Sequence, residues 1–298
     1  MNPLALYFAS GESLYAGAAI LLLTVLASRS AMKPWLSRLR NLASWFALAL
    51  MVMACPPFVW IVDGIFLAAF VLWLAMANDW LKWPGIEWSS FSAVALLILL
   101  ITLTASEFSH RRMPRIVGAP SDHLVVIGDS ISSGIASRAS AWPSVMQQLT
   151  KVPVRNLSRP GAQAAEGTNM AENVTPDDRV VLIQIGGNDL LGGVPAVAFE
   201  KSLDATLSKL VMPGRTMVMF ELPLLPNKIA HGQIQRHLAA KYGVWLIPKR
   251  YFTEVIGGRD ATSDGLHLSE TGAHRMAILV AQTLSSVLRS HSEGQGRQ

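Results

Sequence analysis

The chain has 298 residues, of which 51% are hydrophobic and only 15% are charged. Soluble proteins carry about 25% charged residues, so this composition disfavours a wholly water-soluble protein and favours contact with lipid. The formal net charge of +5 would suit a nucleic-acid-binding protein, but no basic stripe interleaved with aromatic residues occurs in the second half of the chain, so we expect no nucleic-acid partner.

The first 118 residues are predicted to form an all-α transmembrane region. Three stretches are apolar and almost free of charge, at residues 14–27, 42–77 and 89–105. A membrane-spanning helix needs about 20 residues, so the middle stretch is too long for one span and predicts two short spans hinged near Cys55-Pro56-Pro57. With three spans as the alternative, we expect four helices, near residues 12–28, 42–57, 59–77 and 89–106. Cys55 is the only cysteine, which excludes an intrachain disulfide.

Basic residues next to these stretches predict an orientation. Four of them lie between positions 29 and 40, and the positive-inside rule places such a loop in the cytoplasm. Because they follow the first apolar run instead of preceding it, that run is predicted to be a retained helix and not a signal peptide. Four spans would then put the second domain, residues 119–298, on the outer face of the inner membrane, in the periplasm. Three basic residues at 111–115 would also lie outside, which weakens the bias.

From His123 onward the pattern changes to short β-branched runs that alternate with amphipathic segments. Strands are expected at residues 123–128, 152–158, 179–185, 216–221 and 244–248. Helices are expected at residues 140–150, 197–210, 228–242 and 270–288. This alternation predicts an α/β domain with a parallel sheet covered on both faces. Ligands of such sheets bind beyond the carboxyl ends of the strands.

Four polar segments are expected to meet at that edge of the sheet. They are Gly128-Asp129-Ser130, Ser158–Gly161, Gly186–Asp189 and the segment Asp264-Gly265-Leu266-His267. Taken alone, the first of these could be an ordinary turn or a helix cap. Together they supply a hydroxyl, an imidazole, a carboxylate and candidate oxyanion donors. A serine hydroxyl becomes a good nucleophile when a base such as imidazole accepts its proton, so the set predicts nucleophilic catalysis.

In their order and spacing these segments resemble the SGNH hydrolases, also called GDSL esterases and lipases, over about residues 124–284. Ala141-Trp142-Pro143 and the run GGNDLLGG resemble the bacterial thioesterase and lysophospholipase branch. The resemblance implies a three-layer α/β/α, flavodoxin-like fold. It makes Ser130 the nucleophile, His267 the general base and Asp264 the residue that orients His267. The oxyanion hole would consist of the backbone N–H groups of Ser130 and Gly161 and the side-chain amide of Asn188.

These residues lead us to expect a serine esterase that cleaves acyl ester or thioester bonds at a membrane through an acyl-enzyme. The alternatives are an acyltransferase or deacetylase that acts on an envelope glycan or lipid, and an inactive membrane scaffold. The expected partners are the bilayer and a small acyl ester, a lipid or an acylated glycan. No histidine pair stands at a metal-ligand spacing with acidic neighbours, so we expect no metal and no other cofactor. Asp129 and Asp189 are interpreted as hydrogen-bonding residues that organise loops.

Overall fold

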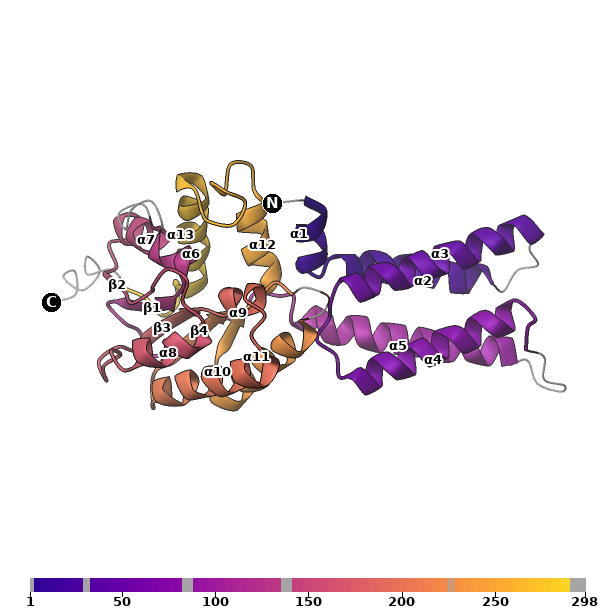
Figure 1. Ribbon diagram of the computed structural model, residues 1–298, viewed down its shortest axis with the longest axis horizontal. Helices are drawn as coiled ribbons and strands as arrows, with labels where there is room; N and C mark the ends of the chain where they lie inside the picture. The colour runs from indigo at the N-terminus through magenta and orange to yellow at the C-terminus, as the bar shows by residue number, and fades with distance from the viewer. Residues whose placement is uncertain are drawn as a thin grey trace. The chain divides into compact units, whose positions relative to one another are not determined.

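The computed structural model describes residues 3–28, 33–81, 88–134, 141–224, 226 and 228–289. The chain divides into two compact units. The helical unit consists of Tyr7–Arg112 and Leu225–Ile229, and the sheet unit of Met1–Leu6, Met113–Leu224 and Ala230–Gln298. The two units are described separately below (Figure 1).

The helical unit contains four long helices, which follow a short helix α1 (Pro3–Ala9) at the start of the chain. They are α2 (Ser13–Ala27), α3 (Pro34–Met53), α4 (Trp60–Ala77) and α5 (Trp88–Ser109). α2 packs against α3, and α4 packs against α5 (Figure 1). Pro56 and Pro57 lie between α3 and α4. They end the helix there, because proline lacks the backbone N–H that a continuing helix requires.

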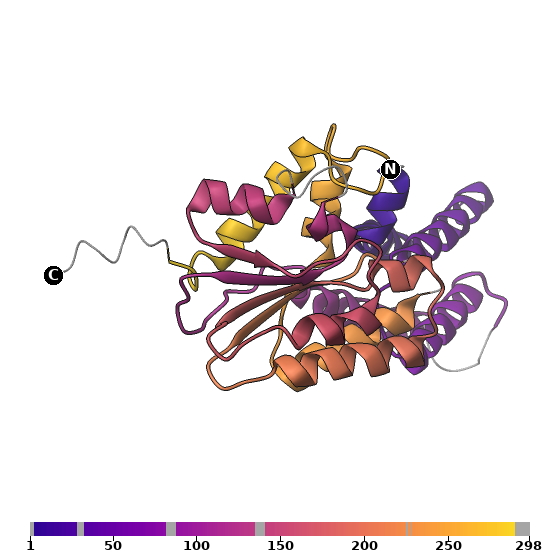
Figure 2. The ribbon, with the colours of Figure 1, turned by 60° about the vertical axis from the view of Figure 1, so that its left-hand side comes forward.

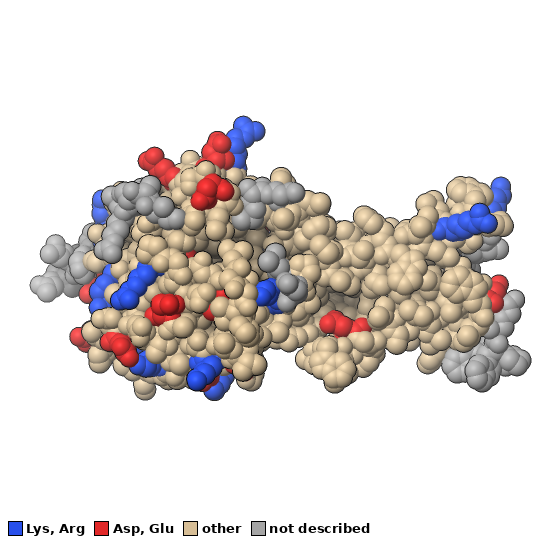
Figure 3. Space-filling model, in the orientation of Figure 1, with Lys and Arg blue, Asp and Glu red and all other residues tan. Residues whose placement is uncertain are grey.

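The helices of this unit are apolar on their outer surface as well as in their core. Phe70 and Trp73 are buried in the core, whereas Leu23, Phe46 and Ile101 point outward and are more than half exposed. The face shown in Figure 3 has few charged side chains along the length of the unit. A helix in water keeps a polar outer face, so this surface is suited to lipid.

Only some of these helices are long and apolar enough to cross a membrane. Among the described residues, α4 and residues Ser90–Ser109 of α5 meet that condition, and α1 with α2 would add a third span if this pair, bent by 78°, is counted as one. The sequence predicts four. The difference lies in α2, which has only 15 residues without α1, and in α3, which begins at Pro34 and includes Arg38 and Arg40. Its apolar part from residue 42 to its end is only about 18 Å long at 1.5 Å per residue.

Arg40 is one of the four basic residues at positions 29–40 that predict the membrane orientation, but it lies within α3 and its side chain is buried. It is 6% exposed and its guanidinium donates hydrogen bonds to the carbonyl of Ala77 at 3.2 Å and to Asn78 Oδ1 at 2.9 Å. Asn41 Nδ2 also donates to Asn78 Oδ1, at 2.8 Å. Arg40 therefore ties the start of α3 to the end of α4.

The sheet unit is built on five parallel strands in the order β2-β1-β3-β4-β5, which is the flavodoxin-like order. They are β1 (Leu124–Gly128), β2 (Val154–Asn156), β3 (Val180–Gln184), β4 (Thr216–Phe220) and β5 (Trp245–Ile247). In β1, Val125 lies opposite Arg155 of the neighbouring β2 and opposite Val181 of the neighbouring β3. Every residue of β1, β3 and β4 is buried. Strands covered on both faces read as continuous apolar runs, which is the pattern that made them predictable.

Helices cover both faces of this sheet and complete three layers, as Figure 2 shows. One layer contains α6 (Ser130–Ser133), α7 (Trp142–Thr150), α12 (Lys249–Gly257) and α13 (Glu270–Leu284). Side chains of these helices, among them Trp142 and Met276, form one buried cluster with Leu182 and Val218 of the sheet. The opposite layer contains α8 (Ala164–Ala171), α9 (Gly187–Leu191), α10 (Ala196–Leu210) and α11 (Ile229–Tyr242). The predicted α/β architecture is therefore confirmed.

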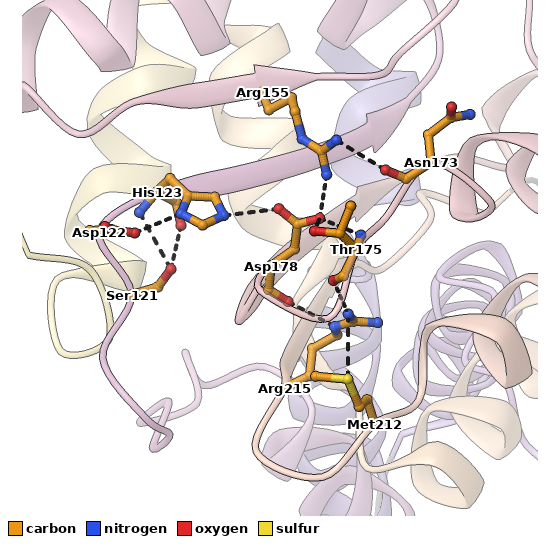
Figure 4. Close-up of polar contacts among 9 residues, drawn as sticks. All are labelled: Ser121, Asp122, His123, Arg155, Asn173, Thr175, Asp178, Met212 and Arg215. Atoms are coloured by element: carbon orange, nitrogen blue, oxygen red, sulfur yellow. Dashed lines mark hydrogen bonds and ion pairs between the residues drawn. The ribbon is translucent and has the colours of Figure 1, made fainter.

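At the edge of the sheet where the strands begin, a cluster of charged side chains connects the segments before β1 and β3 with β2 through hydrogen bonds and ion pairs (Figure 4). Asp178 accepts hydrogen bonds from His123 Nε2 at 2.9 Å and from the N–H of Thr175 at 2.6 Å, and it pairs with Arg155. Burial by itself would raise the pKa of Asp178, but these partners hold it below its usual value. Burial by itself would lower the pKa of His123, but its hydrogen bonds to Asp122 and Asp178 outweigh burial and raise it. This cluster lies at the edge opposite the four polar segments.

Candidate active site

Ser130 stands at the turn between β1 and α6. Asp129 caps this helical turn, because its Oδ1 accepts a hydrogen bond from the N–H of Ile131 at 2.9 Å and its carbonyl accepts one from Ser133 at 2.9 Å. Asp129 is 3% exposed, whereas Ser130 is only partly buried. The cap is thus supplied by the residue before Ser130, and the Ser130 hydroxyl is not needed for it.

His267 and Asp264 form a hydrogen-bonded pair in the loop before α13. His267 Nδ1 lies 2.6 Å from Asp264 Oδ2, and Asp264 Oδ1 accepts the N–H groups of Leu266 at 2.9 Å and His267 at 2.8 Å. The hydrogen bond with the His267 ring, followed by these two backbone N–H groups, holds the pKa of Asp264 below its usual value. An ionised carboxylate on Nδ1 keeps the proton on that nitrogen and leaves Nε2 available as a base.

Ser130 and His267 line the same cavity, which has a volume of about 400 Å³. Ile131, Ala141 and Trp142 line one part of it, and residues of the His267 loop and the start of α13 line another. Residues 130 and 267 are far apart in the sequence, and the fold brings them to one cavity.

Gly161 and Asn188 do not line this cavity, but both belong to loops that join the Ser130 turn. The N–H of Arg159 donates to the carbonyl of Gly128 at 3.1 Å, which attaches the loop after β2 to the end of β1. Asn188 Nδ2 donates to the carbonyl of Ala162 at 2.9 Å, which attaches the loop after β3 to the loop after β2. An amide nitrogen carries two hydrogens, so this contact uses one and leaves one.

Backbone conformation decides the course of both loops. Gly161 has φ +73° with open space where a side chain would begin, and Gly186 has φ +108°. A Cβ on Gly186 would lie 2.9 Å from Leu222 Cδ1 and 3.1 Å from Phe199 Cε2. Glycine is therefore required at 186 on two grounds, left-handed backbone and close packing.

A buried hydrogen-bond network behind Ser130 was not anticipated from the sequence. Ser132 Oγ donates to Gln184 Oε1 at 2.8 Å and accepts a hydrogen bond from Trp142 Nε1 at 3.0 Å. Asn156 Nδ2 donates to the carbonyl of Ser132 at 2.7 Å. The available signal was Gln184, a polar residue that interrupts an apolar strand and therefore needs a buried partner. The network joins the turn that carries Ser130 to β2, β3 and a wall of the cavity.

Asp129 and Asp189 make the loop-organising hydrogen bonds expected of them. Asp189 is 1% exposed and its Oδ2 accepts the N–H of Ala164 at 2.9 Å. Burial raises the pKa of Asp189. Burial also raises the pKa of Asp129 to about 6, against the lowering effect of its hydrogen bonds with Ile131 and Gln184.

The sheet unit is similar to known hydrolases. Residues 126–275 match the model of the GDSL-like lipase/acylhydrolase family. An arylesterase of Vibrio mimicus is 29% identical over 184 residues, which cover 55% of this chain and 88% of the relative. The thioesterase 1/protease 1/lysophospholipase L1 of Escherichia coli (strain K12) is 26% identical over 186 residues, which cover 58% of this chain and 88% of the relative. A crystal structure of TesA has a TM-score of 0.49 and 25% identity, and covers 56% of this chain and 99% of TesA.

Proposed function

This chain belongs to the GDSL-like lipase/acylhydrolase family and is a hydrolase of ester bonds, and on that basis we propose that Ser130, His267 and Asp264 form its catalytic triad. The observation that carries the proposal is geometric. Ser130 and His267 line one cavity, and His267 Nδ1 is hydrogen-bonded to Asp264 Oδ2 at 2.6 Å. An acyl-enzyme mechanism needs a serine beside a histidine base that a carboxylate orients, and these two observations support that assignment.

In the first half of the reaction, Ser130 Oγ attacks the carbonyl carbon of the substrate. His267 Nε2 takes the hydroxyl proton as the Oγ–C bond forms. When the bond between the carbonyl carbon and the leaving oxygen breaks, His267 gives that proton to the leaving alcohol. In the second half, water replaces the alcohol, His267 takes a proton from the water, and the acid leaves as Ser130 regains its proton.

The negative charge that develops on the substrate oxygen needs donors. We assign this role to the backbone N–H groups of Ser130 and Gly161 and to the Asn188 amide. The contact between Asn188 Nδ2 and the Ala162 carbonyl supports the assignment, because it orients the amide and leaves its second hydrogen for the substrate. Loss of one such donor has cost about 10²–10³ in rate in other serine hydrolases.

The helical unit suggests where the enzyme works. Its candidate spans and its exposed apolar side chains support a multi-pass anchor in the inner membrane. With the basic residues at 29–40 in the cytoplasm, four spans would put the sheet unit in the periplasm, whereas the two or three candidate spans would put it in the cytoplasm. The substrate would then be a small acyl ester or thioester, a membrane lipid or an acylated envelope glycan. The membrane anchor also keeps acyl transfer as the second candidate, because a glycan or lipid held at the same surface could replace water as the acceptor.

The triad is tested with a short-chain nitrophenyl ester and the full-length protein in detergent. We expect Ser130→Ala and His267→Ala to lower kcat by about 10³-fold or more, and Ser130→Ala to abolish labelling by a fluorophosphonate. The matched controls are Ser208→Ala and His237→Ala, which alter exposed residues of α10 and α11. Wild-type turnover in either triad variant would refute the assignment. A reporter fused after Arg115 reads the side of the membrane, and a cytoplasmic signal would remove the envelope substrates.

A further inference from the structure

The cavity beside Ser130 has walls of different character. Ile131, Ala141 and Trp142 provide an apolar wall. From the His267 loop and the start of α13, the lining includes the polar residues Ser263, Ser269 and Glu270 beside the apolar Leu268 and Ala273. Among the described residues that line the cavity, Glu270 is the only acidic residue, and no lysine or arginine is present.

The position of the cavity indicates which part of the substrate it holds. Ser130 lines the cavity, but the other two proposed oxyanion donors, Gly161 and Asn188, are not among its lining residues, which favours a carbonyl oxygen directed toward the loops that carry those two donors. The leaving oxygen must lie close to His267, because His267 gives it a proton. A cavity lined by Ser130, by His267 and by the loop that carries His267 is therefore the place for the leaving group.

The start of α13 determines the electrostatic character of this place. Ser269 caps the helix by accepting a hydrogen bond from the N–H of Gly272 at 3.2 Å, and Glu270 is the first helical residue. The N-terminus of a helix attracts anions. Here Glu270 stands in the first turn of the helix and lines the cavity, so an anionic leaving group would meet its negative charge.

We propose, building on the triad above, that Glu270 determines the leaving group: the cavity accepts esters of neutral, hydroxyl-bearing alcohols and disfavours esters whose leaving group carries a carboxylate or phosphate. A volume of about 400 Å³ accommodates a small polyol or a single sugar. The Ser263 hydroxyl donates to the carbonyl of His267 at 3.4 Å, and its lone pairs can accept a hydrogen bond from a substrate hydroxyl. The preferred substrate class is thus an acylated polyol or sugar.

The test uses two aryl acetates that differ in one charge, para-acetoxybenzamide and para-acetoxybenzoate. The quantity measured is the ratio of kcat/KM for the anionic ester to kcat/KM for the neutral ester, with the full-length protein in detergent. We expect Glu270→Gln to raise this ratio about fivefold, as the removal of one unit charge close to another near a protein surface should do. The matched control is Glu200→Gln on α10, which removes the same charge from an exposed residue outside the cavity and leaves the ratio unchanged.

A second measurement needs no substitution. In the wild-type protein, salt screens the repulsion between Glu270 and an anionic leaving group, so the same ratio should rise with ionic strength. The proposal is overturned if the ratio stays constant in Glu270→Gln or in high salt, or if Glu200→Gln changes it equally. Failure of the wild-type protein to hydrolyse the neutral ester, or an undiminished rate in Ser130→Ala, would instead refute the triad. The two failures are therefore distinguishable.

Discussion

Replacement of Gly186 by alanine tests whether backbone conformation after β3 positions Asn188. Gly186 has φ +108° and ψ −12°, and it stands two residues before Asn188. An added Cβ would lie 2.9 Å from Leu222 Cδ1 and 3.1 Å from Phe199 Cε2. Both neighbours are buried, with 6% and 0% exposure, so neither has free space to move into. The added Cβ therefore requires a shift of the loop or a new rotamer of Leu222 within the packed core.

Two costs add at this position. A left-handed conformation costs an alanine about 1–2 kcal/mol, and overpacking of a dense core costs about 1–3 kcal/mol. We therefore expect Gly186→Ala to lower the free energy of unfolding of the sheet unit by about 2–5 kcal/mol, as the sum of these two ranges. Gly193, just beyond the other end of α9, is the matched control, because it has φ +71° and open space around its Cβ position. Gly193→Ala should cost only the conformational part, about 1–2 kcal/mol.

The assay is urea-dependent pulse proteolysis of the full chain in detergent, in parallel with kcat on a nitrophenyl ester. In the fraction that stays folded, Gly186→Ala should lower kcat by up to about 10²-fold, because the displaced Asn188 amide no longer meets the substrate oxygen. Equal destabilisation by the two substitutions would refute the packing argument. A destabilised Gly186→Ala protein with wild-type kcat would refute the role of Asn188.

Two further predictions concern charged pairs. Asp264→Asn should lower kcat by about 10²-fold or more, because asparagine cannot hold the proton on Nδ1 of His267. The measurement is kcat on the nitrophenyl ester. An unchanged kcat would contradict the role of Asp264. His123→Gln should lower the free energy of unfolding by about 1–3 kcal/mol below pH 6.5, as expected for hydrogen bonds to a charged group. The pKa of His123 is raised in the folded protein, so its stabilisation is fully present below pH 6.5 and is lost as the pH rises through the folded value. Asp178 has a lowered pKa, so its contribution to stability is lost only when the pH falls below about 3.8. In urea denaturation, the free energies of unfolding of the wild type and His123→Gln should therefore differ near pH 6 and converge at high pH.

The three central strands of the sheet unit, β1, β3 and β4, were predictable because every residue in them is buried. The runs that end in Gly128, Gln184 and Phe220 are continuous and apolar, and the structure places strands within one or two residues of the expected bounds. α13 begins at Glu270 as predicted and ends earlier, at Leu284. Local composition was enough in these cases.

Several helices were not predicted: the short α1, α6 and α9, and the longer α8 and α12. α8 contains Gly167, which disfavours a helix locally. In the fold that glycine permits close packing, because a Cβ there would lie 2.9 Å from Thr206 Oγ1 on α10. A capping box between Gln163 and Glu166 also starts the helix. α12 has only nine residues, and its helical pattern is too short to stand out.

In the candidate site, too, some features depend on residues close in the sequence and others depend on the tertiary structure. Asp264 and His267 are three residues apart, and their hydrogen bond depends on one loop, so the sequence alone could determine this pair. The apolar composition of the first 118 residues and the parallel α/β pattern are likewise local properties. By contrast, the tertiary structure brings together residues distant in the chain in the cavity that Ser130 shares with His267 and Glu270, and in the Gln184 network. Only the tertiary structure decided these, because contacts between distant residues depend on the strand order and on the packing of helices across the sheet.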